Sequence, residues 1–193
     1  MQRMEAVLAG VFGAIFLALS IFVTVETLLR KLFNFSLQGA DELGGYALAI
    51  GSTIAFTLAL AGRNHIRIDV FHAFFPRALR AALNWLSIVL LAAAAALFAA
   101  VSFRLVDESL AYRSTAQTAW ATPLALPQSL WYAGLILFAV AAMAHAARAT
   151  WLLATGRIGR LNEEFHPKST KEELVEELDD LAQRRAAPRN DAR

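Results

Sequence analysis

Four long runs of apolar residues occupy most of the first 157 positions, and short charged clusters separate them. A helix needs about 20 apolar residues to cross the hydrocarbon core of a bilayer, and each run is long enough. Backbone groups in lipid must bond to one another, so runs of this kind form helices. The first run exceeds the roughly 7–15 apolar residues of a cleavable signal peptide, so we expect it to be retained. The predicted spans are about 6–29, 43–62, 83–101 and 130–153.

The pattern changes after Arg157, where charged residues become frequent. Ser169 and Glu172 form a capping-box pattern, which is typical of a helix start. Leu174, Leu178 and Leu181 then recur at helical spacing among acidic residues. We therefore predict a transmembrane domain over residues 1–157 and a cytoplasmic tail over 158–193, with a short amphipathic helix from about Thr170 to Arg185 in the tail.

A shorter amphipathic segment precedes the third span. Residues 69–75 can form a short helix at the membrane surface, with Asp69 as its cap, and Pro76 suits the start of the next helix. The expected fold class is an all-α membrane protein with four transmembrane helices, short interfacial helices and a soluble C-terminal helix.

Composition supports a membrane location and excludes several functions. Hydrophobic residues make up 58% of the chain and charged residues 18%, whereas soluble domains have about 45–50% and about 25%. The net charge is +2, but no nucleic-acid-binding motif is present. The chain has no cysteine, and it lacks nucleophile motifs and glycine-rich phosphate loops. We therefore predict neither an enzyme nor a cofactor-binding protein, and no partner among nucleic acids.

The distribution of lysine and arginine predicts the orientation, because such residues concentrate in cytoplasmic loops. Eight basic residues near the spans would lie on one side and four on the other. This bias places both termini and the second loop in the cytoplasm. The eight are Arg3, Arg63, Arg67, Arg77, Arg80, Arg148, Arg157 and Arg160, and the four are Arg30, Lys31, Arg104 and Arg113.

Two ionisable residues lie inside predicted spans, where charge is costly and often functional. Glu26 precedes Arg30 by one helical turn, which favours an ion pair and a structural or subunit-contact role. For His145 we expect local packing or a hydrogen bond. Haem bound between helices would need a second histidine at similar depth, and the sequence places none there.

Polar clusters flank the second span on both sides. The first reads E-x-x-x-R-K-L-F-N-x-S over residues 26–36 and is followed by Asp41 and Glu42. The second reads R-N-H-I-R-I-D over residues 63–69 and is followed by Pro76. Together with four spans, these clusters resemble the DctQ family, the small membrane subunits of tripartite ATP-independent periplasmic (TRAP) transporters. One departure is that Gly39 and Ala40 stand where a tryptophan often precedes the acidic pair.

The resemblance implies a small permease subunit in the bacterial inner membrane. Its partners would be a large membrane subunit, which takes up an organic acid with sodium, and a periplasmic substrate-binding protein. Small residues in the second span, such as Gly45 and Gly51, would suit helix contacts. The alternatives are an accessory four-span subunit of a tricarboxylate-type system and a haem-binding bundle. The candidate subunit-contact or structural residues are Glu26, Arg30, Asn34, Glu42, Arg63, His65 and Asp69.

Overall fold

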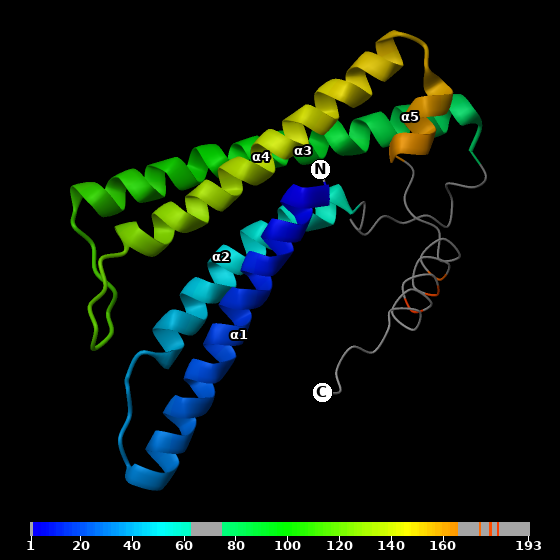
Figure 1. Ribbon diagram of the computed structural model, residues 1–193. Helices are drawn as coiled ribbons and strands as arrows, with labels where there is room; N and C mark the ends of the chain where they lie inside the picture. The colour runs from blue at the N-terminus through cyan, green and yellow to red at the C-terminus, as the bar shows by residue number, and fades with distance from the viewer. Residues whose placement is uncertain (1, 63–74, 166–173, 175–177, 179–180, 182–193) are drawn as a thin grey trace.

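The computed structural model describes residues 2–62 and 75–165, together with Leu174, Leu178 and Leu181 (Figure 1). Within these residues the chain forms five helices. They are α1 (Gln2–Phe33), α2 (Ala40–Ala61), α3 (Arg77–Ala111), α4 (Ala125–Ala154) and α5 (Ile158–Phe165). Helices α1 to α4 are long and apolar enough to cross a membrane. The predicted class of a four-span all-α membrane protein is therefore confirmed.

The helices extend beyond the apolar runs from which the spans were predicted. Helix α3 has 35 residues, which at a rise of about 1.5 Å give a rod of about 52 Å. The hydrocarbon core is only about 30 Å thick. Helix α3 begins directly after Pro76, whose φ of −62° suits a helix start, and continues to Ala111. Its charged ends, with Arg77 at one end and Asp107 at the other, therefore project toward the two membrane surfaces.

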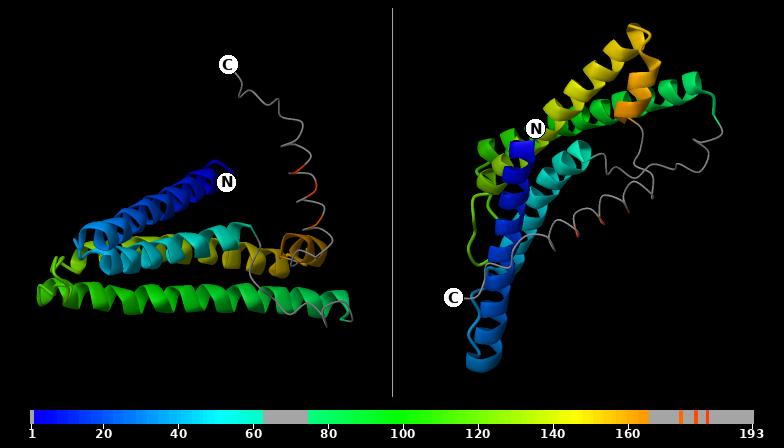
Figure 2. Two further views of the ribbon diagram at one scale, coloured as in Figure 1. Left: turned by 90° about the horizontal axis from the view of Figure 1, so that it is seen from below. Right: turned by 45° about the vertical axis from the view of Figure 1, so that its right-hand side comes forward.

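The four spans form two antiparallel hairpins, α1–α2 and α3–α4. Helices α3 and α4 share the most extensive contact, and α2 packs on both α1 and α4. Seen from below, α1 lies on one side of the α2 and α4 layer and α3 lies on the other (Figure 2). Helix α2 is therefore the element that joins the two hairpins within the bilayer.

The interface between α3 and α4 is built largely from alanine. Small side chains on both helices are buried, and larger ones such as Ile88, Leu135 and Phe138 fill the remaining space. Alanine allows two backbones to approach closely enough for dispersion contacts to hold them together in lipid. The buried alanines are Ala81, Ala92, Ala95, Ala139, Ala142 and Ala149.

Helix α2 makes close contacts at two small-residue positions. A Cβ atom added at Gly51 would lie 2.5 Å from the Phe16 ring of α1, and one added at Gly134 of α4 would overlap the Thr53 hydroxyl of α2. Neither glycine can therefore be replaced without moving a neighbouring group. Gly45 has no atom within 4 Å of an added Cβ, so the small-residue pattern overstates the contacts of α2.

Helix α5 folds back against the ends of α3 and α4 (Figure 1). The chain reverses after α4 at Gly156, which has a φ of 70° that favours glycine. Leu161 and Phe165 of α5 are buried, and Leu161 is completely inaccessible to solvent. The first residues of the segment assigned to the tail are thus packed on the transmembrane helices, and the sequence analysis did not anticipate this helix. Further on, Leu174, Leu178 and Leu181 are helical and exposed.

Candidate functional site

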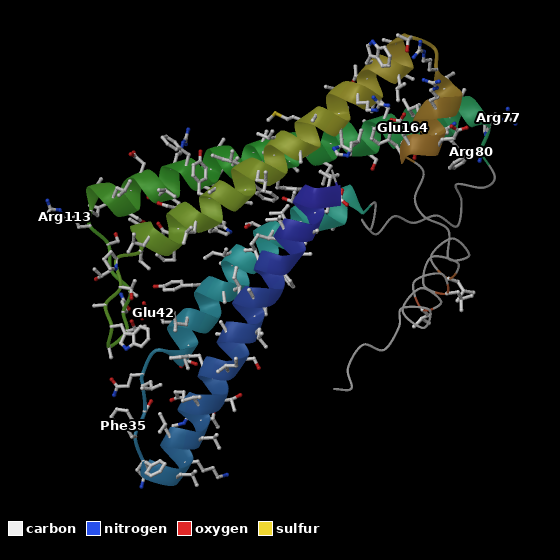
Figure 3. All side chains as sticks on the ribbon, in the orientation of Figure 1. Phe35, Glu42, Arg77, Arg80, Arg113 and Glu164 are labelled. Carbon is white, nitrogen blue, oxygen red and sulfur yellow. The ribbon has the colours of Figure 1, made fainter. Side chains whose placement is uncertain are left out.

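The loops between α1 and α2 and between α3 and α4 meet at one end of the molecule, which we call the loop end. In the α3–α4 loop, Ala116 N–H donates to Thr122 O and Leu124 N–H donates to Ser114 O, both at 2.9 Å. These bonds close a narrow antiparallel turn. Figure 3 shows this turn extending from Arg113 to the level of Glu42 at the start of α2. The turn therefore brings the second hairpin into contact with the first.

Glu42 is the charged group in this contact. It is buried, although it lies in the first turn of α2. The Tyr46 hydroxyl, one turn later, donates to Glu42 Oε1 at 2.9 Å. The Thr118 hydroxyl, from the α3–α4 loop, donates to the other carboxylate oxygen. A buried carboxylate needs such donors, so Glu42 connects the two hairpins by hydrogen bonds and is not free for other chemistry.

Trp120 makes the second contact between the loops. Its indole N–H donates to Leu37 O at 3.2 Å, and its ring meets Phe22 edge-on at 6.3 Å. A Cβ atom at Gly39 would overlap the indole, so only glycine fits beneath it. The tryptophan beside the acidic pair comes from the α3–α4 loop in this chain. We call Leu37, Gly39, Glu42, Thr118 and Trp120 the inter-loop cluster.

Glu26 lies at the loop end of α1 and is only 4% exposed. The Ser36 hydroxyl donates to its Oε1 at 2.9 Å. Arg30 Nη2 lies 3.8 Å from its Oε2, so the ion pair predicted from the spacing is present but longer than a hydrogen bond. The Arg30 side chain is 63% exposed. An ion pair that is this open to solvent is worth little, so Glu26 depends chiefly on Ser36.

A small open pocket of about 200 Å³ lies beside Glu26, between the end of α1 and the start of α2. Val23 lies on its apolar side. Glu26, Arg30 and Asp41 supply its charged groups, and Ser36 and Gln38 supply neutral polar groups. We call this cavity the α1–α2 pocket.

Asn34 is exposed and has a φ of 51°, and Gln38 in the same loop has a φ of 56°. Asparagine tolerates this left-handed conformation better than most residues. The position of Asn34 is therefore explained by the turn that ends α1. Of the other predicted site residues, Arg63, His65 and Asp69 lie outside the described residues, so the structure brings together only Glu26, Arg30 and Glu42 at the loop end.

The opposite end contains polar contacts that the sequence analysis missed. Arg148 of α4 donates two hydrogen bonds to Glu164 of α5, at 2.5 and 2.7 Å. Asn162 accepts from Asn84 at 3.1 Å and donates to the Arg77 carbonyl at 3.0 Å. These contacts attach α5 to α3 and α4 (Figure 3). The spacing of Leu161 and Phe165, four residues apart after a glycine, was the signal that could have revealed α5.

His145 is accounted for by local bonding. Its Nδ1 lies 2.8 Å from the Ala141 carbonyl, which can only accept, so Nδ1 must donate. The ring meets Phe165 of α5 edge-on at 6.3 Å. The expected role in packing and hydrogen bonding therefore matches the geometry. Among residues 2–62 and 75–165, no group of three or more His, Asp or Glu side chains could hold a metal ion.

Hydroxyl groups within the spans bond to their own helices. Ser52 donates to Leu48 O at 2.6 Å, Thr53 to Ile50 O at 2.8 Å and Thr57 to Thr53 O at 3.3 Å. Thr24 donates to Ser20 O in α1 in the same way. Each hydroxyl proton is therefore occupied by a carbonyl one turn earlier. These side chains do not form a polar path through the described bundle.

Comparison with known proteins gives one family match. A family model described as "Tripartite ATP-independent periplasmic transporters, DctQ component" matches residues 19–151, which is most of the chain. The matched region runs from the middle of α1 almost to the end of α4 and includes the loop end. A search of the curated proteins finds no match.

Proposed function

Because this chain belongs to the DctQ component family of the tripartite ATP-independent periplasmic transporters, we propose that it is the small permease subunit that steadies a larger membrane subunit during transport. The large subunit would take up an organic acid together with sodium. A periplasmic binding protein would deliver that substrate. The chain itself would bind no cofactor and catalyse no reaction.

The observation that supports this role is the placement of polar groups. The ionisable side chains of the described spans lie within about three turns of the helix ends, as Glu26, Glu42, Arg80 and Arg148 illustrate. The hydroxyl groups nearer the middle bond to their own backbone. A carrier moves ions past polar groups near the middle of the membrane. A chain without such groups in its described spans is suited to supporting another subunit.

The polar residues at both ends of α2 would fix the chain against its partner. In this proposal Glu26, Arg30, Asn34 and Glu42 act at the periplasmic side, and the cluster at 63–69 (Arg63, His65 and Asp69) acts at the cytoplasmic side. Helices in lipid gain little from hydrophobicity when they associate. Specific contact therefore needs close packing and polar groups at the membrane surfaces.

Reconstitution tests the supporting role directly. Liposomes that contain this chain alone should show no sodium-dependent uptake of organic acids above empty liposomes. Liposomes with the large subunit and the binding protein should show uptake, and omission of this chain should reduce it. Uptake by the isolated chain would contradict the proposal.

The proposed orientation has its own test. Reporter fusions after Leu37 and Gln117 should report a periplasmic location, and a fusion after Arg160 should report a cytoplasmic one. A cytoplasmic signal at Leu37 would contradict the orientation without affecting the supporting role.

A further inference from the structure

Glu26 has more capacity to accept hydrogen bonds than its neighbours use. An ionised carboxylate offers about four lone-pair sites. Among the described residues, the one side-chain donor within hydrogen-bond distance is the Ser36 hydroxyl, at 2.9 Å from Oε1. Arg30 Nη2, at 3.8 Å from Oε2, is beyond that distance. Since only 5% of the Glu26 side chain is exposed, its second oxygen requires a donor from the α1–α2 pocket that it lines.

The charges around the pocket specify the chemistry of that donor. Two carboxylates, those of Glu26 and Asp41, line the cavity beside a single guanidinium, that of Arg30. Asp41 is exposed, and most of the Arg30 side chain is also exposed. An ammonium group can therefore lie between the two acids, while an anion attached to it meets Arg30. A ligand with a cation and an anion a few bonds apart satisfies all three groups.

We propose that the α1–α2 pocket binds the phosphoethanolamine head group of a membrane phospholipid. The ammonium donates to Glu26 and Asp41, and the phosphate accepts from Arg30. The apolar Val23 lies beside the ethylene carbons. The pocket lies where α1 ends and α2 begins, at the membrane surface where such head groups are concentrated. This inference does not depend on the proposed transport role.

The pocket favours phosphoethanolamine over the other common head groups. Phosphocholine carries a quaternary ammonium, which has no N–H to donate to Glu26. Phosphoglycerol has no cation, so its phosphate would be repelled by two carboxylates. A lysine from a partner protein would satisfy the acids but would face the positive Arg30 with no anion to offset it.

Native mass spectrometry of the full-length chain tests the proposal. The detergent-purified protein is equilibrated with equal amounts of dioleoyl phosphatidylethanolamine, phosphatidylcholine and phosphatidylglycerol. One or two exposed charge contacts predict a preference for phosphatidylethanolamine of about three- to tenfold. The double variant Glu26→Gln, Asp41→Asn should lose this preference, because the amide oxygen introduced at position 26 still accepts from Ser36 but neither replaced side chain is charged.

Asp107→Asn is the matched control, because Asp107 is an exposed carboxylate near the same end of α3. It should leave the preference unchanged. Asp41→Asn alone, at an exposed position, gives the test if the double variant does not fold. Equal binding of the three lipids by the wild-type chain, or a preference retained in the double variant, would overturn the proposal.

Two further arms identify the source of the ligand. Displacement of the lipid by excess soluble glycerophosphoethanolamine supports binding of the head group by itself. Persistence of the lipid under that excess supports the same site with the acyl chains contributing. The pocket would instead hold a partner's side chain if the assembled complex retained no phosphatidylethanolamine and Glu26→Gln reduced co-purification of the large subunit. That result would overturn the proposal.

Discussion

The two hairpins differ in what holds them together. In the most apolar stretches of α3 and α4, 22% of the residues are buried inside the protein, whereas in the corresponding stretch of α1 none is. Alanines bring α3 and α4 together along much of their length, and α5 covers one end of the pair. Helix α1 packs mainly on α2, through contacts such as Phe16 on Gly51.

This difference shows which half of the protein has a core of its own. The α3–α4–α5 unit contains large buried side chains such as Ile88, Leu152 and Leu161. Helix α1 presents large apolar side chains such as Leu17 and Ile21 to its surroundings, and these gain nothing from association in lipid. The structure therefore predicts that changes in the second hairpin affect stability strongly and that changes on the open face of α1 do not.

The largest effect is expected from Leu161→Ala. This side chain is fully buried between α5 and the α3–α4 pair. Its loss leaves a cavity, which should lower the free energy of unfolding by about 2–5 kcal/mol. Thermal unfolding of the detergent-purified protein, followed by size-exclusion chromatography, measures the change. Leu17→Ala, at a position that is 64% exposed, should have almost no effect. Equal losses in the two variants would contradict the comparison.

Gly134→Val should have the next largest effect, because it separates the two hairpins. Its Cβ would overlap Thr53, which is almost completely buried. Overpacking of this kind costs about 1–3 kcal/mol. The matched control is Gly13→Val in α1, where an added Cβ meets nothing within 4 Å. Chemical crosslinking between cysteines introduced in α2 and α4 should decrease for Gly134→Val and remain unchanged for the control.

Trp120→Phe tests the inter-loop cluster. Phenylalanine keeps an aromatic ring near Phe22 but cannot donate to Leu37 O, so we expect a loss of about 0.5–1.5 kcal/mol. Faster hydrogen exchange of backbone amides in the α3–α4 loop would accompany the loss. Trp131→Phe is the control, because the Trp131 indole has no hydrogen bond within the described part of the chain. A loss as large for Trp131→Phe would indicate that the cluster does not depend on this bond.

The smallest effect is expected from Arg148→Gln, which breaks the ion pair with Glu164. The Arg148 side chain is 56% exposed and that of Glu164 is 30% exposed, so solvent screening limits the loss to about 0–1 kcal/mol. The difference from wild type should shrink further at about 1 M salt, where the Debye length is about 3 Å. A difference that persists at high salt would mean that packing of α5, not charge, is responsible.

The hydrophobic pattern was sufficient to predict the four spans, because a stretch of about 20 apolar residues has few alternatives to a membrane helix. The Glu26–Arg30 pair was also predictable, since both residues belong to one helix and lie one turn apart. The role of Glu42 was not predictable in detail. Its donor Thr118 is 76 residues away, and no local rule relates the two positions.

Two other features depended on packing that the sequence does not display. Trp120 was expected at a membrane surface, but its position over Gly39 follows from how the α3–α4 loop folds. Helix α5 has only eight residues, and its charged composition suggested a separate tail. Its two buried residues become informative only when α3 and α4 are known to lie beside them. The roles of Arg63, His65 and Asp69 stay predictions.

The separation of bonding partners along the chain sets an order for biosynthesis. Glu26 obtains its hydrogen bond from Ser36, ten residues later, so the ribosome supplies both groups almost together. Glu42 must wait until Thr118 has been synthesised, by which time α3 is complete. During that interval Tyr46 is the nearest donor on its own helix. The first hairpin can therefore enter the membrane with Glu26 already bonded, whereas the bonds between the loops can form only during the insertion of the second hairpin.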